Sequence, residues 1–514
     1  MSLLPPPLRP RALRLAFALS GLLAGAAVPA ATLTVVHTGD SGAGSLRQAI
    51  TDANATSDAD TIAFAIPGAG PFTITPATRL PNLRGVLTID GFTQPGSHAN
   101  TLAPDQGGLD AVPMIQVTGP GNGFGFVLEG GSAPASVTLR GLVINGFAPH
   151  IGGGAAGARL TLHGCYIGTT ADGTAAVPSA SMACITTAGT LQLGGTLPAQ
   201  RNLLANCGNG AVVAGNGETV IEGNLIGTDA GAGRALPGSI AGNGAGIIVN
   251  AGSGNPRLRI GGASVAARNL ISGNHGSGGI ALFGTLGFAA YAQFEILGNY
   301  IGTDWTGTRA IPNGYPDTPR FSGGIVLWRV AQDDSPAPIG GDGPGQANLI
   351  AYNHGAGILS REGRIGESFD NRGNRIQHNR GIGRTNVDLA PAGPTPNDPA
   401  DADAGANGGQ NWPQIDAAVV AGGQLQVTYR VDSSPQASAY PLRVDFYENV
   451  QGGNGALLGR DSYPAGAAQQ PRTIVLALPP GARAVPLVAV ATDARGYSSE
   501  FSPAFGVLFE DDFE

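Results

Sequence analysis

Three aspartates stand close together in a segment whose composition suits cation binding. Asp398, Asp401 and Asp403 lie within residues 397–407, which also contain two asparagines. Carboxylate and amide oxygens are the ligands that Ca²⁺ prefers in proteins. Gly405 stands where a further acid would be expected, and no glutamate follows at the spacing of an EF-hand loop. The segment predicts a calcium site, with a soluble Asp-rich hinge as the alternative. No other cofactor is required.

A second group of residues could bind sugars. The chain is only 6% aromatic, yet one stretch contains Tyr300, Trp305, Tyr315 and Trp328, with Arg309 among them. Flat rings beside arginine and aspartate suit stacking against a sugar ring. The alternative is that some of these rings cover strand ends and pack locally. We take the five residues as predicted ligand-binding residues, and an extracellular polysaccharide or a cell-surface glycan as the predicted partner.

A third group could do acid–base chemistry. If the repeats described below are aligned, their outward positions form a polar stripe of His163, Glu222, Glu295, Asp370 and Arg372. The same alignment predicts inward positions for Leu160, Leu162, Ile221, Phe294, Ile296 and Phe369. Paired carboxylates within about 5–10 Å can hydrolyse glycosides. These acids are several windings apart, however, and Arg372 is the one basic residue of the stripe. The stripe therefore predicts either the catalytic face of a polysaccharide lyase or glycoside hydrolase, or an ordinary solvated polar face.

One short phrase recurs along the chain and indicates where these groups must lie. Its copies are residues 164–169, 223–228 and 298–303, each ending in Ile-Gly-Thr, with a decayed copy at 373–376. An Asn-Leu phrase recurs between them at 201–204, 268–271 and 347–350. Recurrence of this kind indicates a coil of short strands in which each winding stacks on the last. The insertions that follow each Gly-Thr are expected on one side of the coil.

The spacing of the asparagines predicts the length of a winding. Asn202 and Asn224 are 22 residues apart, and Asn348 and Asn374 are 26 residues apart, so each pair spans one winding. The 75-residue separation of Asn224 from Asn299 predicts three windings. Roughly twelve windings at about 4.8 Å each would make a rod on the order of 60 Å long.

Asparagine at matching places also predicts ladders along the coil. A carboxamide both donates and accepts, so stacked copies can hydrogen-bond to one another. Three columns are expected: Asn202, Asn269 and Asn348; Asn206, Asn274 and Asn353; Asn224, Asn299 and Asn374. We assign these asparagines a structural role rather than a binding role.

These phrases resemble those of exported bacterial right-handed parallel β-helix proteins of the broad pectin-lyase-like superfamily. The segment Asp-Ser-Gly-Ala-Gly-Ser-Leu-Arg-Gln-Ala at 40–49 is similar to the amino-terminal cap of the same proteins. Ser45 and Gln48 predict a capping box at the start of a short helix with Leu46, Ala49 and Ile50 on its apolar face. The resemblance implies an all-β fold, a parallel β-helix solenoid with an N-terminal cap. It does not specify an activity, because that superfamily has many.

The two ends of the chain differ from the repeats. Arg9, Arg11 and Arg14 followed by the apolar run 15–28 predict a secretory signal peptide, too short to span a membrane. After Trp412, alternating strands are typical of a β-sandwich, and residues 491–501 are similar to the end of immunoglobulin-like modules. The predicted organisation is a signal peptide (1–30), N-terminal cap and first coils (31–117), β-helix (118–390), Asp/Pro-rich linker (391–411), immunoglobulin-like β-sandwich (412–508) and acidic tail (509–514).

Bulk composition limits the partners. The net charge is −8 and the pI is near 5.4, which argues against nucleic acid. The odd count of three cysteines (Cys165, Cys184 and Cys207) permits one disulfide, but repeat register places them apart and favours three buried thiols. We expect a secreted or cell-surface monomer without a transmembrane segment, acting as a glycan- or surface-binding scaffold, with a polysaccharide lyase or glycoside hydrolase as the alternative.

Overall fold

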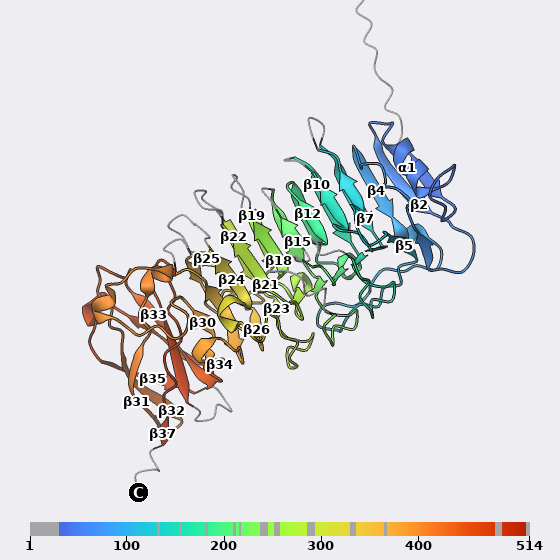
Figure 1. Ribbon diagram of the computed structural model, residues 1–514. Helices are drawn as coiled ribbons and strands as arrows, with labels where there is room; N and C mark the ends of the chain where they lie inside the picture. The colour runs from blue at the N-terminus through green and yellow to red at the C-terminus, as the bar shows by residue number, and fades with distance from the viewer. Residues whose placement is uncertain are drawn as a thin grey trace, which may run out of the picture.

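The computed structural model describes residues 30–130, 134–154, 157–179, 183–208, 212–214, 217–236, 245–250, 257–284, 293–328, 336–363, 367–478 and 486–509. The predicted signal peptide, apart from residue 30, lies outside the described residues. Residues 510–514 of the predicted acidic tail lie outside them as well. Figure 1 shows an elongated molecule, with the amino-terminal elements at one end and the carboxy-terminal strands at the other.

Three long parallel sheets form most of the molecule, with nine, ten and nine strands in the described part of the chain. Sheet A contains β1 (Thr32–Val35), β2 (Ala59–Phe64), β4 (Val86–Asp90), β7 (Ser136–Arg140), β10 (Arg159–His163), β13 (Thr190–Gly194), β16 (Thr219–Glu222), β19 (Arg257–Gly261) and β22 (Gln293–Leu297). Sheet B contains β3 (Phe72–Ile74), β5 (Ile115–Thr118), β8 (Leu142–Asn145), β11 (Tyr166–Ile167), β14 (Leu203–Leu204), β17 (Leu225–Ile226), β20 (Leu270–Ile271), β23 (Tyr300–Ile301), β26 (Leu349–Ala351) and β29 (Arg375–Gln377). Sheet C contains β6 (Phe126–Leu128), β9 (Ile151–Gly153), β12 (Ile185–Thr187), β15 (Val212–Ala214), β18 (Ala245–Asn250), β21 (Gly278–Phe283), β24 (Gly323–Trp328), β27 (Ala356–Ser360) and β30 (Val387–Asp388).

The strand order shows that the chain winds. From β7 to β21 each strand pairs with the third strand after it: β7 with β10 in sheet A, β8 with β11 in sheet B, β9 with β12 in sheet C. The chain therefore visits the three sheets in turn, and each winding lies on the previous one. This all-β arrangement of long parallel sheets is consistent with the predicted parallel β-helix.

The interior of the coil is a continuous apolar core. Alternate residues of each strand point inward, as the sequence predicted for Leu160, Leu162, Ile221, Phe294 and Ile296, which are all at most 1% exposed. One cluster of buried hydrophobic side chains runs from Val35 to Ala406. Burial of this kind supplies most of the driving force for folding.

The asparagines form one continuous ladder where the sequence predicted two separate columns. Side-chain hydrogen bonds run from Nδ2 to Oδ1 of the next asparagine at 2.9–3.1 Å through Asn202, Asn224, Asn269, Asn299, Asn348 and Asn374. Successive members are 22, 45, 30, 49 and 26 residues apart. The 75-residue repeat therefore spans two windings, not three, because winding length varies with the insertions.

A second ladder follows sheet B at the corner toward sheet C. It runs through Asn274, Asn313, Asn353, Asn379 and Asn386 with bonds of 2.8–2.9 Å. The prediction was right for Asn274 and Asn353 and wrong for Asn206. Strand pairing sets Leu204 beside Ile226 and Ile226 beside Ile271, so Asn206 corresponds to Gly273 rather than Asn274. Asn206 instead bonds to the carbonyl of Val177.

The cysteines also differ from the prediction. Cys184 and Cys207 form a disulfide with a Cα–Cα distance of 5.1 Å, and Cys165 is a buried free thiol. The one-residue shift at Asn206 explains the discrepancy, because it moves Cys207 into the ladder position of Asn274. There it reaches Cys184, at the start of β12.

The amino-terminal end carries the predicted helix. Helix α1 (Leu46–Ala53) begins where Ser45 Oγ accepts a hydrogen bond from the Gln48 amide, and Leu46, Ala49 and Ile50 are buried. The Gln48 side chain donates to Asp52 rather than returning to Ser45, so only half of the capping box forms. None of the helices in the described residues has both the length and the apolar character needed to cross a bilayer.

The carboxy-terminal part contains two further sheets and rests against the last windings. Its strands are β31 (Gln414–Ala421), β32 (Gln424–Arg430), β35 (Arg472–Ala477) and β37 (Leu508–Phe509) in one sheet, and β33 (Leu442–Val450), β34 (Gly453–Tyr463) and β36 (Leu487–Thr492) in the other. Most pairs are antiparallel, and both sheets contribute to one hydrophobic cluster. A two-stranded sheet, β25 (Ala337–Pro338) with β28 (Phe369–Asp370), continues the line of sheet A.

Replacement of one ladder asparagine should destabilise the coil. Asn299 Nδ2 donates to the carbonyls of Ile260 and Leu297 and to Asn348, and its Oδ1 accepts from Asn269. Asn299→Ala leaves these buried groups without partners, so we expect a loss of about 2–4 kcal/mol in the free energy of unfolding. Denaturant titration measures the loss. Asn122→Ala, at an exposed loop position, is the control; equal stability of the two variants would contradict a stabilising ladder.

A buried histidine should make the fold sensitive to acid. His150 is 1% exposed, neither ring nitrogen has a hydrogen-bond partner within the described part of the chain, and burial lowers its pKa from 6.5 to about 4. As the pH falls from 6.5 to 4, the imidazole of His150 takes up a proton in the unfolded chain before it does so in the folded chain. The free energy of unfolding therefore decreases over this range, by up to ~3 kcal/mol.

The test compares wild type with His150→Leu by denaturant titration at several pH values. The comparison is necessary because Glu500, whose pKa burial raises to about 7, titrates with the opposite sign. We expect the variant to lose less stability than wild type between pH 6.5 and pH 4. Parallel stability curves would refute the assignment to His150.

Candidate functional site

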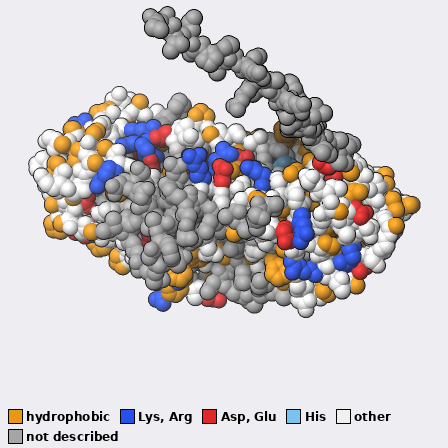
Figure 2. All heavy atoms as spheres, turned by 90° about the horizontal axis from the view of Figure 1, so that it is seen from above, with side chains coloured by type: hydrophobic (Ala, Val, Ile, Leu, Met, Phe, Trp, Pro, Cys, Tyr) orange, Lys and Arg blue, Asp and Glu red, His pale blue; other side chains and the backbone are white. Residues whose placement is uncertain are grey.

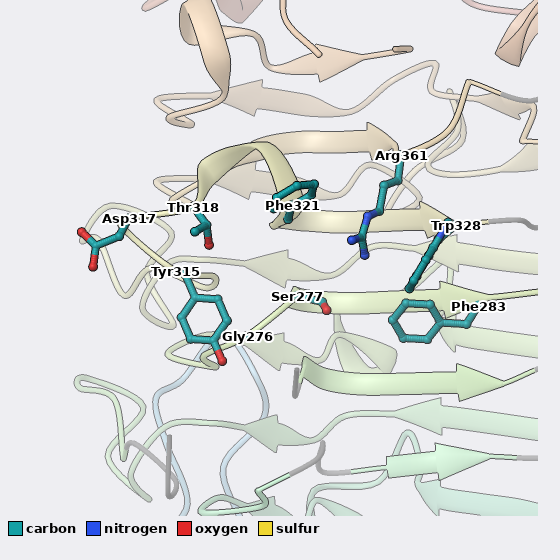
Figure 3. A pocket seen from close by; sticks show the side chains of 9 residues that line it. All are labelled: Gly276, Ser277, Phe283, Tyr315, Asp317, Thr318, Phe321, Trp328 and Arg361. Carbon is teal, nitrogen blue, oxygen red and sulfur yellow. The ribbon is translucent and has the colours of Figure 1, made fainter. Parts of the chain in front are cut away.

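An open depression of about 480 Å³ lies on the outer side of sheet C and extends from the corner that precedes this sheet to the ends of its strands. Its lining residues are Gly276, Ser277, Phe283, Tyr315, Asp317, Thr318, Phe321, Trp328 and Arg361. In Figure 3, Phe283 and Trp328 lie next to each other near the ends of neighbouring strands, and Arg361 extends toward them. Tyr315 and Asp317 lie on the opposite side, on the loop that follows the third insertion.

The aromatic wall is positioned by strand register. Phe283 of β21 pairs with Trp328 of β24, and their ring centroids are 5.4 Å apart at an interplanar angle of 74°. Trp328 takes an outward position because Ile325 and Leu327 point into the core. Its indole Nε1 donates to Glu362 Oε1 at 2.6 Å, which orients the ring.

Arg361 lies between two of the rings. Its guanidinium carbon is 3.9 Å from the centroid of Trp328 and 4.9 Å from that of Phe321, while Arg320 lies 4.3 Å from the Phe321 ring. Cation–π contacts of this kind hold a planar charge against an aromatic surface. Phe321 remains 39% exposed. The depression therefore combines exposed ring surface with charged groups, Arg361 on one side and Asp317 on the other.

Sequence reasoning found part of this site. Tyr315 and Trp328 line the depression, but Phe283, Phe321 and Arg361 were missed. The signal for Phe283 was present, because residues 278–283 and 323–328 share the pattern Gly-Gly-Ile-x-Leu-aromatic. Alignment of these two strands would have placed Phe283 beside Trp328.

The other three predicted ligand-binding residues do not line the depression. The insertion loops close with equivalent bridges, Thr169 with Ala176, Thr228 with Ala235 and Thr303 with Ala310. They also bond to one another, since the amide of Trp305 donates to the carbonyl of Ala232. Tyr300 and Trp305 pack on a hydrophobic cluster beneath these loops, and Arg268 covers the Tyr300 ring at 4.1 Å.

Tyr300 and Trp305 thus occupy the packing role that the sequence left as an alternative. Arg309 is exposed on the same loop, where its amide donates to Asp304 Oδ1.

The polar stripe is largely neutralised by arginine. Glu222 forms an ion pair with Arg259 at 2.9 Å, and Asp370 forms one with Arg372. Glu295 lies on β22, two strands beyond Glu222 on β16, and the strand register places it beside Arg259 of β19, two residues along the strand from Glu222. The Cα atoms of Glu222 and Glu295 are therefore about 12 Å apart. Figure 2 shows blue and red side chains next to one another on one face of the molecule.

Burial shifts the pKa of two members of this stripe, Glu222 and His163. Burial raises the pKa of Glu222, and the charge of Arg259 opposes that increase. Burial and the charge of Arg140 both lower the pKa of His163, whose Nε2 lies 3.5 Å from Gln200 Nε2. His163 lies on β10, two strands from Glu222. The stripe is a set of paired charges rather than an acid–base pair around one open position.

The three aspartates at the junction do come together. Their carboxylate oxygens lie within 4.8 Å of one another. Asp401 is buried and accepts hydrogen bonds from Ser433, Ser438 and Asn411. Asp398 Oδ2 accepts from the amides of Ala402 and Asp403, whereas its Oδ1 is buried and has no hydrogen-bond partner among the described residues. Burial raises the pKa of Asp401 and of Asp403, and the charge of Asp398 raises both further.

A scan against protein-family models and a search of curated proteins found no match to this chain. Its function must therefore be argued from the geometry of the depression, the polar stripe and the aspartate cluster.

Proposed function

We propose that this chain is an exported scaffold that binds an extracellular or cell-surface glycan in the depression beside sheet C. The observation that carries the proposal is the partly exposed aromatic surface of Phe283, Tyr315, Phe321 and Trp328 around a cavity of about 480 Å³. Sugars present apolar C–H faces and hydroxyl edges. Aromatic rings stack against the C–H faces of a sugar, and the side chains of Asp317 and Arg361 can form hydrogen bonds with its hydroxyl groups.

The finer fold assignment is part of the proposal. We infer a right-handed parallel β-helix of the pectin-lyase-like kind, closed at its carboxy-terminal end by an immunoglobulin-like β-sandwich. The stacking of equivalent asparagines along the coil supports the first part, and the shared core of the two carboxy-terminal sheets supports the second.

Export from the cytoplasm is supported by the Cys184–Cys207 disulfide. Disulfides persist in oxidising compartments and are rare in the cytosol. The basic and apolar pattern of residues 1–30 agrees with this location.

Binding is favoured over polysaccharide cleavage by the state of the polar stripe. A general acid and base must face one substrate position with matched pKa values. Glu222 and Asp370 are instead engaged by Arg259 and Arg372, and Glu295 lies two strands from Glu222. Product release from a polysaccharide panel, lost in Glu222→Gln or Asp370→Asn, would reverse this preference.

The ring surface is tested by truncation on a glycan array. Trp328→Ala removes the largest ring of the depression, so we expect the Kd for the retained glycan to rise about tenfold, a change of ~1.4 kcal/mol. Trp305→Ala is the matched control, because Trp305 belongs to the third insertion loop and packs on a hydrophobic cluster outside the depression. Loss of binding in Trp305→Ala with full binding in Trp328→Ala would move the site to the loops and overturn the proposal.

We further propose that Asp398, Asp401 and Asp403 hold Ca²⁺. The supporting observation is Asp398 Oδ1, a buried carboxylate oxygen to which no described residue donates a hydrogen bond, inside a group of three acids. Calcium prefers such oxygen ligands and tolerates irregular geometry. A cation would also relieve the repulsion that raises the pKa of Asp403.

Calcium should stabilise the folded chain by mass action. At a concentration 100 times the Kd, the free energy of unfolding should rise by about 2.7 kcal/mol, seen as a higher Tm that chelator reverses. Asp398→Asn and Asp403→Asn should abolish the calcium-dependent part. Asp105→Asn, at an exposed position far along the sequence, should retain it. A wild-type Tm that does not respond to calcium would refute the site.

A further inference from the structure

The corner after sheet B has a recurrent left-handed backbone conformation. In the windings without an insertion, the residue two positions after the paired isoleucine or leucine is Gly146, Asn206, Gly273, Tyr352 or His378, with φ of 69°, 59°, 77°, 64° and 58°. Glycine and asparagine adopt this conformation most readily, whereas a bulky side chain there is strained. The last two windings therefore have an aromatic side chain, Tyr352 or His378, at this left-handed position. The earlier windings have glycine or asparagine there.

The two rings stack on each other along the coil. Their centroids are 5.0 Å apart at an interplanar angle of 12°, and both residues are half-buried. This separation exceeds the contact distance of about 3.5–4.0 Å between stacked carbon atoms, so the rings are slipped and each leaves part of a face uncovered. Tyr352 Oη donates to the carbonyl of Thr308 at 3.3 Å, which fixes the pair beside exposed Arg309.

Polar groups connect this ring pair to the depression. His354 follows Tyr352 by two residues, and its pKa is lowered by burial and by the charges of Arg380 and His275, while Asp317 opposes them. These groups therefore lie close enough to interact electrostatically. Asp317 lines the depression, and His275 precedes Gly276, which also lines it. On the side of Phe321 and Asp317, the depression is therefore continued by His354 and then by Tyr352 and His378.

We propose that the Tyr352–His378 ring pair is a second subsite for the same glycan, so that the ligand is a chain of several sugar units rather than a single residue. The inference rests on the proposed function of the depression. Strained backbone persists where the surrounding structure compensates for it, and such positions concentrate at binding sites. The rings of Tyr352 and His378 provide apolar surface, and the neighbouring Arg309 and His354 provide hydrogen-bonding groups. The depression combines the same two features.

The test replaces each ring with the residue that the fold itself uses at this corner. Tyr352→Asn and His378→Asn reproduce Asn206, which has the same backbone conformation. The probes are cello-, xylo- and galacturono-oligosaccharides of two and eight units, with Kd measured by calorimetry and Tm by thermal unfolding. We expect wild type to bind the eight-unit member of the retained series about tenfold more tightly than the two-unit member.

In Tyr352→Asn this length advantage should disappear while two-unit binding stays unchanged. The Tm should be unchanged or higher, because relief of backbone strain offsets the lost stacking. Asn206→Gly, which alters the same corner far from the ring pair, should leave both affinities as in wild type.

The outcomes separate the two proposals. If wild type binds none of the probes, the proposed function fails and this inference fails with it. If wild type binds but the eight-unit affinity survives both ring replacements, the second subsite alone is refuted. A lower Tm with unchanged length dependence would show that the ring pair serves packing only, which also refutes the subsite.

Discussion

The fold depends on the hydrogen bonds between stacked asparagines inside the coil. Each carboxamide of the first ladder accepts from the winding before it and donates to the winding after it, in a buried position where an unpaired amide would be costly. The ladder fixes the position to which each winding must bring its asparagine, but it does not fix the number of residues in the winding. Ladder members are 22 to 49 residues apart. Windings therefore differ in length only at their corners and loops. A binding surface can form there without a change in the stacked strands.

The same constraint explains why the candidate site lies where it does. Residues that bond in the ladders cannot also face a ligand, and inward strand positions are occupied by the core. Outward strand ends and the corners remain, and Trp328, Phe283 and Arg361 occupy them. On sheet A the outward positions hold ion pairs between arginine and acid, such as Arg259 with Glu222. All 28 basic residues are arginine, whose guanidinium holds a carboxylate in fixed geometry. This face is thereby less suited to acid–base chemistry.

The stacked windings could be predicted from the sequence, but the exact register between them could not. Phrase recurrence predicted parallel strands and the inward residues Leu160 and Ile296 correctly. It separated Asn224 from Asn269 because their flanking residues differ, although both occupy one ladder. At Asn206 an asparagine suited to a left-handed corner resembled a ladder member, and the resulting shift of one residue hid the Cys184–Cys207 disulfide. Arg361 was missed because its neighbours in the depression come from other windings.

The end of the coil shows why the carboxy-terminal sheets belong to the same physical unit. A parallel coil ends in unpaired strand edges, which would otherwise pair with another chain. Here Asn454 of β34 accepts from the Ile376 amide and donates to the backbone carbonyl of Asn374, both at 2.6 Å, and so pairs with the backbone of β29 at the last ladder position. Glu500 accepts from the Leu389 amide, next to β30, and Asn407 accepts from the Phe369 amide of β28. Asn407 belongs to the segment that also carries Asp398, Asp401 and Asp403. A cation held by those acids would therefore act on the closure of the last winding, and through the ladder on the stability of the coil.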